Sequence, residues 1–260
     1  MTMLQNVRKA AGIVRETGLP GMMYLLTVAV PIPLTANLRW SVGTRAEIFF
    51  WENYFRTGGA EWAESYRSRL DPHTPLQPRP AALLPDRNQV DILDVGAGPL
   101  THLGKQCPGK TLRITAVDPL ADEYQRMYRK YQIDPPVHTT RLAAEDISGN
   151  IPPNCYDLVF ARNCIDHARN PEAAILQMVD VVKPGGYVLL EHRPNEAVNE
   201  RYRGLHQWNF SSTSEGEFLI GSRKSLVNMT LKYARLCTIQ CETVHESPDG
   251  EMLITRIQKK

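Results

Sequence analysis

The chain has 260 residues, of which 42% are hydrophobic and 22% are charged. This composition excludes a disordered protein and a collagen-like repeat, and it indicates a globular fold. Thirty basic residues against 28 acidic ones give a formal net charge of +2. Because nucleic-acid binding usually needs a larger basic excess, we expect no nucleic-acid partner.

The five cysteines and the N-terminus bear on the cellular compartment. The cysteine count is odd and no pair is spaced C-x-x-C, which argues against a disulfide scaffold and a structural zinc site. No signal peptide is evident, so we expect a cytoplasmic protein. Residues 17–38 carry no charge, but three prolines interrupt them. This pattern predicts a buried or lid-forming helix rather than a membrane span. Contact with a membrane surface and a homodimer interface are open alternatives.

Residues 1–85 are predicted to form a helical N-terminal extension or lid with a proline-rich connector. A helix is expected over residues 44–57, and a second short one includes Trp62 and Tyr66. Aromatic residues such as Trp40 and Trp51 either pack on the main domain or form a lid wall. Residues 71–80 contain four prolines, which predicts an extended link without helix.

Residues 86–260 are predicted to form one α/β domain. Apolar runs predict strands over residues 90–95, 113–118, 137–142, 157–161 and 187–191. Asn170, Pro171 and Glu172 are typical of a helix start, and the helix is expected to end near residue 183. A late helix is predicted over residues 225–234. Two last strands, 236–244 and 252–257, are expected to form a hairpin around residues 247–250. The alternation indicates a mostly parallel sheet.

The segment Ile92-Leu-Asp-Val-Gly-Ala-Gly-Pro-Leu-Thr101 carries the main functional signal. Gly96 and Gly98 allow close approach of a ligand and a sharp turn into a helix. Pro99 follows, and the third glycine of the dinucleotide fingerprint is absent, which disfavours a nucleotide-dependent dehydrogenase. Asp94 and Asp118 lie at strand ends, where carboxylates favour a cation over a pyrophosphate. The pattern predicts a nucleoside ligand with a positively charged tail.

These motifs resemble the class I S-adenosylmethionine (SAM)-dependent methyltransferases. The resemblance rests on Leu93-Asp-Val-Gly-Ala-Gly98, Ala116-Val-Asp-Pro119, Tyr156-Asp-Leu-Val-Phe160 and Val182-Lys-Pro-Gly-Gly-Tyr-Val-Leu-Leu190. It implies a Rossmann-like seven-stranded sheet with its last strand antiparallel, and a methyltransferase that uses SAM. Ala143 stands where many members carry the aspartate that reads adenine, so backbone groups, Glu145 or Asp146 are left as alternatives. The residues expected to contact SAM are Asp94, Gly96, Ala97, Gly98, Asp118, Pro119, Glu145, Asp146, Arg162 and Asn163.

The ends of the fourth and fifth predicted strands supply candidate catalytic residues. Asp166 and His167 follow the fourth strand, and Glu191 and His192 end the fifth. Because ligands bind at the carboxyl ends of such strands, we expect all four at one rim. By resemblance to small-molecule O-methyltransferases, Asp166 or His167 is the candidate base, and we include Glu191 in the catalytic set. Alternatively, Asp166, Glu191 and His192 hold Mg²⁺, which would bind a diol.

The segment Asn195–Phe210 is rich in amides and aromatic rings, which is typical of carbohydrate recognition. It is similar to a segment of bacterial methyltransferases of glycans and secondary metabolites, including mycobacterial sugar O-methyltransferases. His192, His206 and Trp208 are therefore expected to bind the acceptor. The predicted function is methyl transfer from SAM to a hydroxyl of a small polar acceptor, a sugar or oligosaccharide. A lipid, quinone or secondary-metabolite acceptor and a non-catalytic partner subunit are the alternatives.

Overall fold

The computed structural model of the protein describes residues 36–246 and 250–260. Residues 17–35 of the uncharged segment, which was predicted as a buried or lid-forming helix, lie outside the described residues. Residues 247–249 of the predicted turn also lie outside them. Within the part of the chain that is described, no helix combines the length and the apolar character needed to cross a membrane.

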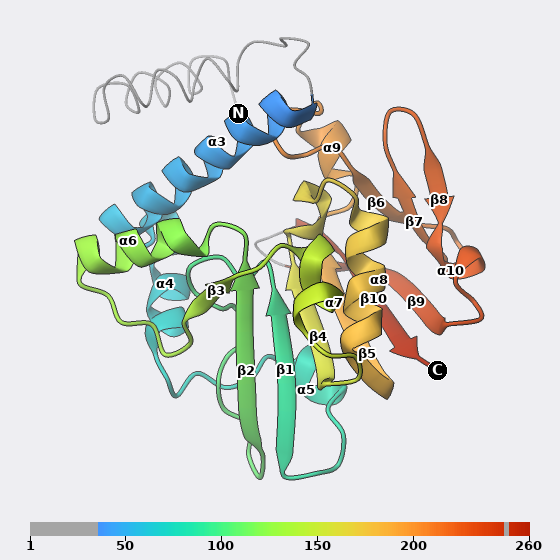
Figure 1. The fold of residues 1–260 in the computed structure, drawn as a ribbon, viewed down its shortest axis with the longest axis horizontal. Coiled ribbons are helices and arrows are strands. Elements are labelled where there is room, and N and C mark those ends of the chain that lie inside the picture. The colour runs from blue at the N-terminus through green and yellow to red at the C-terminus, as the bar shows by residue number, and fades with distance from the viewer. Residues whose placement is uncertain (1–35, 247–249) are drawn as a thin grey trace.

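A seven-stranded sheet with the order β3-β2-β1-β4-β5-β10-β9 forms the centre of the molecule (Figure 1). β10 runs antiparallel to both neighbours, β5 and β9, whereas the β1, β2, β3, β4 and β5 pairings are parallel. The predicted α/β fold with a Rossmann-like sheet is thus confirmed. The strands are β1 (Gln89–Val95), β2 (Thr111–Asp118), β3 (Thr139–Arg141), β4 (Tyr156–Arg162), β5 (Val182–His192), β9 (Cys237–Glu246) and β10 (Gly250–Lys259).

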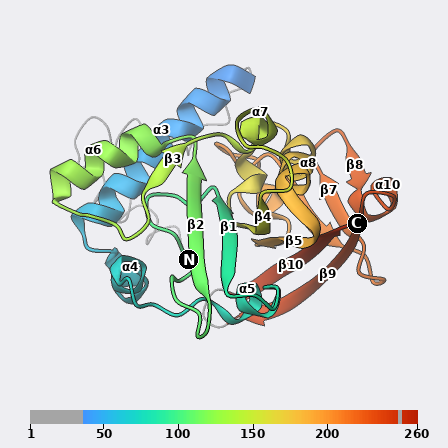
Figure 2. The ribbon, with the colours of Figure 1, turned by 60° about the horizontal axis from the view of Figure 1, so that its bottom comes forward.

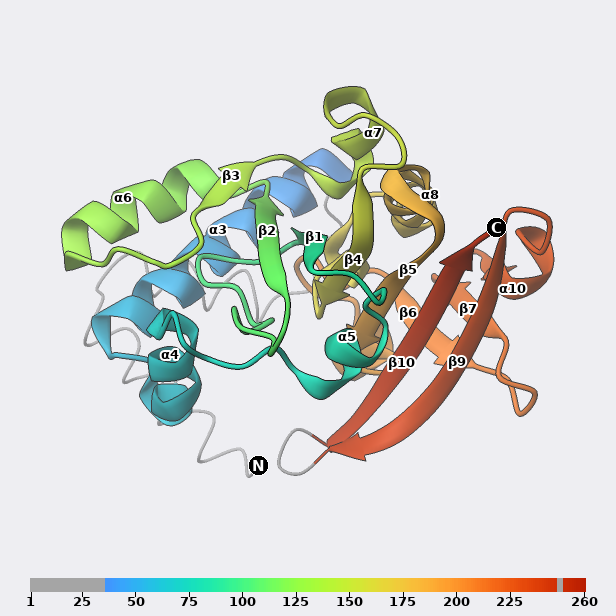
Figure 3. The same ribbon diagram turned by 90° about the horizontal axis from the view of Figure 1, so that it is seen from below.

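Helices cover the two faces of this sheet (Figure 3). α7 (Ile147–Asn150) and α8 (Pro171–Val181) lie on one side, and α4 (Ala63–Leu70) and α5 (Pro78–Ala82) lie on the other. The Asn170 side chain accepts a hydrogen bond from the backbone N–H of Ala173 at 3.1 Å and so caps α8, as predicted. Leu93, Val159 and Leu190 pack on the α8 side, while Ile92, Phe160 and Leu189 pack on the α5 side. This alternation follows from the twofold period of a strand.

The connection from β1 to β2 differs from the prediction of a helix after the glycine pair. Turns and bends, with no helix, fill the chain between Val95 and Thr111. Residues 74–77 of the connector run alongside this segment and occupy the place where a helix was expected. Leu76 N donates to Gln106 O at 2.6 Å. A Cβ at Gly104 would meet Pro75 O at 2.0 Å, so only glycine permits this close approach.

Two further local predictions are wrong. The connector is not extended to its end, because α5 begins at Pro78; proline fits the first turn of a helix, where its missing N–H costs nothing. The predicted late helix is replaced by β8 (Leu226–Asn228) and the short α10 (Met229–Lys232). β8 pairs with β7 (Phe218–Gly221), which also pairs with β6 (Asn209–Ser212), in a second sheet. Buried aromatic residues of β6 and β7 join the main core. This tertiary pairing overrides local propensity.

The long helix α3 (Ala36–Arg56) crosses above the carboxyl ends of the central strands (Figures 1 and 2). Tyr54 and Phe55 are buried against Tyr124 and Tyr128 of α6 (Ala121–Tyr131). η1 (Ala60–Trp62) connects α3 to α4. The division into an extension up to residue 85 and a domain over residues 86–260 stays a prediction, but α3 is attached to that domain through an aromatic contact layer.

Candidate functional site

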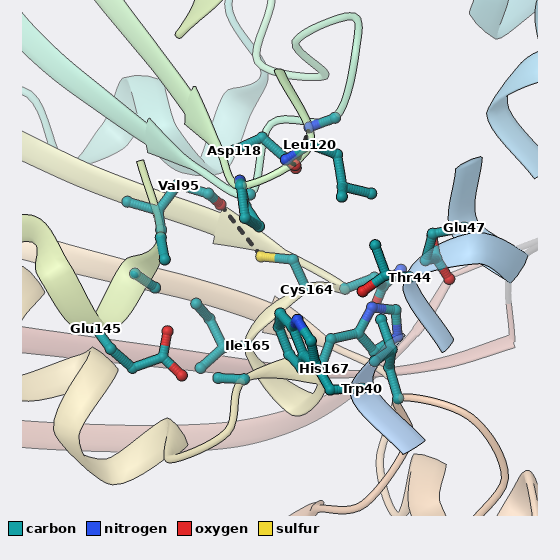
Figure 4. A pocket seen from close by; sticks show the side chains of 18 of the residues that line it. Trp40, Thr44, Glu47, Val95, Asp118, Leu120, Glu145, Cys164, Ile165 and His167 are labelled. Atoms are coloured by element: carbon teal, nitrogen blue, oxygen red, sulfur yellow. Dashed lines mark hydrogen bonds between the residues drawn. The ribbon is translucent and has the colours of Figure 1, made fainter. Parts of the chain in front are cut away.

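A pocket lies at the carboxyl ends of β1, β2 and β4, beneath α3, and we call it the strand-tip pocket. Figure 4 shows Thr44 and Glu47 reaching it from α3, with Glu145 on the opposite side. The placement follows from the fold, because the carboxyl ends of parallel strands form the ligand-binding edge of an open α/β sheet. Its lining residues are Trp40, Thr44, Glu47, Trp51, Val95, Gly96, Gly98, Asp118, Pro119, Leu120, Tyr124, Ala143, Ala144, Glu145, Asn163, Cys164, Ile165, His167, Ala168 and Leu205.

The two glycines of the loop after β1 are required by close contacts. Gly96 and Gly98 have φ angles of 65° and 63°, which side chains rarely adopt. A Cβ at Gly96 would lie 2.5 Å from the Sγ of Cys164, and one at Gly98 would lie 3.0 Å from Trp51 of α3. The Cys164 thiol donates to the Val95 carbonyl at 3.1 Å (Figure 4). The backbone of the loop therefore forms the floor of the pocket.

Asp118 presents a carboxylate at the end of β2. Its oxygens accept hydrogen bonds from the backbone N–H groups of Leu120 at 2.8 Å and Gly98 at 3.2 Å, and from the Tyr124 hydroxyl at 3.2 Å. Burial raises the pKa of the Asp118 carboxyl to about 6, against the lowering effect of these hydrogen bonds. Asp118 is ionised above that pH and can then accept hydrogen bonds from a ligand in the pocket.

Asp94 holds the loop rather than lining the pocket. Thr101 Oγ1 donates to Asp94 Oδ2 at 2.6 Å, and Leu103 N donates to Thr101 Oγ1 at 3.2 Å. Burial raises the pKa of the Asp94 carboxyl to about 7, although the Thr101 hydrogen bond lowers it. Asp94, predicted to contact SAM, is thus placed where it anchors the loop below the pocket.

The other residues expected to contact SAM divide into two groups. Pro119, Glu145 and Asn163 line the pocket with Gly96, Gly98 and Asp118, whereas Ala97, Asp146 and Arg162 do not. One oxygen of Glu145 accepts the backbone N–H groups of Arg169 at 2.8 Å and Asn170 at 3.3 Å, ahead of α8. Asp146 is exposed to solvent. The adenine-reading position after β3 is thus bordered by the small side chains of Ala143 and Ala144 and by Glu145.

Three side chains converge next to the pocket, and we call Asp166, His167 and His206 the imidazole cluster. His206 Nδ1 lies 3.0 Å from Asp166 Oδ2 and 3.2 Å from His167 Nε2, and His167 Nε2 lies 3.5 Å from Asp166 Oδ2. Among these three, His167 lines the pocket. The 3₁₀ turn Ile165–His167 after β4 supplies two members, and the segment after α9 (Glu196–Asn199) supplies His206.

The electrostatics of this cluster keep Asp166 ionised. Burial by itself raises the pKa of the Asp166 carboxyl, but nearby His167 and the hydrogen bond from His206 outweigh it and hold the pKa well below its usual range. His192 lies behind the turn, where its Nε2 accepts the backbone N–H of Ile165 at 3.1 Å. Burial lowers the pKa of His192 to about 4, so this imidazole is neutral. His192 is therefore a support for the turn and not a residue of the pocket wall.

Glu191 is separated from the other three residues predicted at one rim. It points to the opposite face of the sheet, where it pairs with Arg162 and lies 3.5 Å from Arg79. Both arginines also pair with Glu246, and we call these four residues the ion-pair network. Successive strand residues face opposite sides, so Glu191 and His192 cannot share a site. The predicted magnesium trio of Asp166, Glu191 and His192 is therefore not assembled.

Trp208 has a positioning contact rather than a place in the pocket wall. Its Nε1 donates to the Ala168 carbonyl at 3.0 Å and thereby ties the segment of His206 to the turn of His167. Leu205, three residues earlier, lines the pocket and lies close to Gly43 of α3. Of the three residues expected to bind the acceptor, His206 alone belongs to the imidazole cluster.

One group of pocket residues outside the predicted site residues comes from α3. Trp40, Thr44, Glu47 and Trp51 line the pocket at positions separated by three or four residues, as one face of a helix requires. The sequence contained a signal for this face, because a lid wall was one of the two interpretations of aromatic residues such as Trp40 and Trp51. With Asp118 and Glu145, Glu47 makes the lining acidic, and the two tryptophans add π faces that attract cations. The pocket is suited to a positively charged ligand with an aromatic ring.

Comparison with known proteins agrees with this geometry. Residues 93–190 match the family described as "Methyltransferase domain". The tRNA U34 carboxymethyltransferase of Shewanella amazonensis is 28% identical over 135 residues, which are 50% of this chain and 37% of that protein. The enzyme of the same name from Geobacter sp. strain M21 is 29% identical over 134 residues, or 50% and 38% of the two chains. The match therefore covers well under half of these curated relatives.

Solved structures give a weaker comparison. A SAM-dependent methyltransferase from Mesorhizobium loti has 13% identity and a TM-score of 0.43, covering 70% of this chain and 96% of that one. The 1,6-didemethyltoxoflavin-N1-methyltransferase of Burkholderia thailandensis has 13% identity and a TM-score of 0.46, covering 89% and 93%. The fold is defined by the strand order of the chain itself rather than by these overlaps. The family match over residues 93–190 and this strand order both agree with the methyltransferase fold expected from the sequence.

Proposed function

We propose that the chain binds SAM in the strand-tip pocket and transfers its methyl group to a hydroxyl of a small polar acceptor. The observation that carries this proposal is the pocket itself, in which Gly96, Gly98 and Asp118 meet the acidic and aromatic face of α3. A glycine floor admits a ligand against the backbone, and a strand-end carboxylate can accept the two ribose hydroxyls.

The residues present fit a sulfonium nucleoside. Among the residues that the structure describes, Glu47, Asp118 and Glu145 bring three carboxylates to the pocket lining, and none of the described lining residues is Lys or Arg. An anionic pyrophosphate would be repelled by this lining, whereas a sulfonium is stabilised by it. SAM, when bound, supplies a methyl group that is already activated for displacement. The chain then has to orient the acceptor, exclude water and handle one proton.

The acceptor is expected to lie between the pocket and the imidazole cluster. His167 belongs to both, so an acceptor hydroxyl that contacts His167 in the pocket also comes close to Asp166 and His206. Loss of the hydroxyl proton during attack is assisted by a nearby basic or Lewis-acidic group. Glu191 is no longer proposed in this role, because its carboxylate is engaged with Arg162 on the other face.

The class of acceptor has two candidates. A sugar or oligosaccharide fits the polar segment over residues 195–210, which supplies His206 beside the pocket. The second candidate is tRNA, because the curated relatives that match half of this chain are named for a tRNA uridine. The expectation of no nucleic-acid partner rested on the net charge alone and is therefore not carried forward.

A labelled-methyl assay tests the proposal. SAM with a labelled methyl group is incubated with the full chain and, separately, mono- and oligosaccharides, phenols, lipids and unmodified tRNA. We expect transfer to a hydroxyl compound, and a loss of at least about tenfold in His167→Ala. The matched control is His138→Ala, which removes an exposed histidine that also contacts an aspartate, Asp134, at 3.0 Å.

The outcomes separate the candidates. Transfer to tRNA alone would replace the small acceptor by a nucleic acid while leaving the cofactor assignment intact. An unchanged rate in His167→Ala would remove the imidazole cluster from the reaction. If SAM neither bound nor donated its methyl group to any member of the panel, the proposed function would be rejected.

A further inference from the structure

The imidazole cluster has the dimensions of a metal site. Its three ligand atoms, Asp166 Oδ2, His167 Nε2 and His206 Nδ1, lie 3.0, 3.2 and 3.5 Å from one another. Ligands at about 2.1 Å from one zinc ion in tetrahedral geometry are separated by about 3.4 Å. The three distances therefore allow a single ion to lie within bonding distance of all three atoms.

Hydrogen bonding accounts for this cluster only in part. His206 Nδ1 is close to both Asp166 Oδ2 and His167 Nε2, but a ring nitrogen carries at most one proton. If that proton is donated to the carboxylate, the contact with His167 lacks a well-directed hydrogen bond. If the nitrogen instead accepts from His167, its lone pair faces the carboxylate. A cation at the centre satisfies all three atoms at once.

We propose that Asp166, His167 and His206 bind a divalent transition-metal ion, with Zn²⁺ as the best match. Two imidazole nitrogens and one carboxylate oxygen leave a fourth coordination position open, as in catalytic zinc sites. Mg²⁺ is a poorer match because it prefers oxygen ligands in an octahedral arrangement. The ligand set also differs from the trio predicted from the sequence, since it contains neither Glu191 nor His192.

The surrounding contacts hold the ligands in place. His167 N donates to Cys164 O at 3.1 Å, and His206 N donates to Arg203 O at 3.1 Å, so both ligand segments are closed turns. The Trp208 indole joins the two segments through Ala168. The side chain of Asp166 is buried, which limits competition by water. These contacts fix the backbone of both ligand segments relative to each other.

The cluster adjoins the pocket through His167, which lines it, whereas Asp166 and His206 are not among the lining residues. An ion held by all three can take an acceptor oxygen as its fourth ligand and lower the pKa of that hydroxyl. This role rests on the proposed function, whereas the ligand set follows from the side-chain positions alone.

Cobalt titration tests the site directly. The full chain is stripped with a chelator, dialysed and titrated with CoCl₂ while the visible d–d absorption is followed. We expect one equivalent to give the intense bands of four-coordinate Co²⁺, and Zn²⁺ to displace it. His167→Ala and His206→Ala, each checked for folding by circular dichroism, should each bind Co²⁺ at least about tenfold more weakly. His138→Ala should bind as the wild type does.

Failure of this inference can be told apart from failure of the proposed function, because SAM binding is measured on the same samples by calorimetry. If wild-type protein binds SAM but gives no such spectrum, the metal site is rejected and the cofactor site stands. If Co²⁺ binds but SAM does not, the methyltransferase proposal is rejected and the metal site stands. Equal Co²⁺ affinity in the wild type and both cluster variants would also reject this ligand set.

Discussion

The imidazole cluster and the ion-pair network both lie near the carboxyl ends of β4 and β5, but they differ in how their charges are matched. In the network, Arg79 and Arg162 meet the carboxylates of Glu191 and Glu246, so positive and negative charges are matched. In the cluster, two imidazoles share one oxygen of a buried carboxylate. The first arrangement satisfies its members, and the second leaves coordination capacity unused.

The difference between these two regions comes from a single step along β5. Glu191 and His192 are adjacent in sequence, yet they lie on opposite faces of the sheet. The face of Glu191 carries charges that pair with each other beside α5. The face of His192 supports the turn that presents His167 to the pocket. We therefore expect Glu191 on one face to contribute to stability and His192 on the other face to support the turn beside the pocket.

Removing Glu191 should have the largest effect on stability. Glu191 is fully buried and its pairing with Arg162 is largely shielded from water. Glu191→Ala removes this partner and should lower the free energy of unfolding by about 3–5 kcal/mol, measured by urea denaturation. The affinities for SAM and Co²⁺ of the folded variant should change less than about threefold, because the cluster is on the other face. Loss of either affinity with unchanged stability would contradict the division between the faces.

Asp94 offers a test through pH. Its folded pKa of about 7 is above the ordinary value of 3.8, so the folded state holds a proton that the unfolded state releases. The resulting stabilisation is complete below about pH 4 and is lost as the pH rises toward and through 7. Asp94→Asn should abolish this loss, and its stability relative to the wild type should increase by about 2 kcal/mol between pH 5 and pH 8.

Thermal unfolding of both proteins at the two pH values measures this effect. Asp118→Asn serves as a comparison, because burial also raises that pKa, but only to about 6. Between pH 5 and pH 8, the stability of Asp118→Asn relative to the wild type should also increase. A wild type that becomes more stable relative to Asp94→Asn as the pH rises would contradict the burial of a protonated Asp94.

Trp208→Phe should give the smallest effect on stability. It tests whether the hydrogen bond between the two ligand segments positions the imidazole cluster. It removes the hydrogen bond from Nε1 to the Ala168 carbonyl and keeps most of the aromatic contact. The expected loss is about 1 kcal/mol in the free energy of unfolding. Co²⁺ affinity should fall as well, since the two ligand segments lose their direct tie. A variant with weakened stability but wild-type Co²⁺ affinity would show that the tie does not position the ligands.

The sequence predicted the sheet well because its strands are continuous apolar runs. β1, β2 and β4 agree with prediction within two residues at each end, and the β9–β10 hairpin was expected from the two last runs. Gly96, Gly98 and Asp118 were found because a ligand-binding loop constrains residue type at fixed spacing. The strands of the second sheet were missed because they have only three or four residues each, too few for an apolar pattern to show. They are stabilised by pairing with one another and by packing on the main core.

The chemical site was less accessible from the sequence. His206 lies 40 positions from Asp166, so their contact depends on the completed fold. The packing of Trp51 against Gly98 likewise joins a distant helix to the loop. The separation of Glu191 from His192 was different, because the twofold period of a strand already forbids a shared face. The alternation of side chains along a strand could therefore have separated these two residues, but the prediction of one rim for Asp166, His167, Glu191 and His192 did not take it into account.

Calorimetric titration of SAM into the wild-type chain and Asp118→Asn tests the central claim most directly. The strand-tip pocket should bind one SAM per chain in the wild type, and the variant should bind it about tenfold or more weakly, because a carboxylate facing the cationic nucleoside is lost. Equal binding by the two proteins would place SAM elsewhere. No heat of binding to the folded wild type at hundreds of micromolar SAM, on the order of the weakest useful cofactor affinity, would contradict the account.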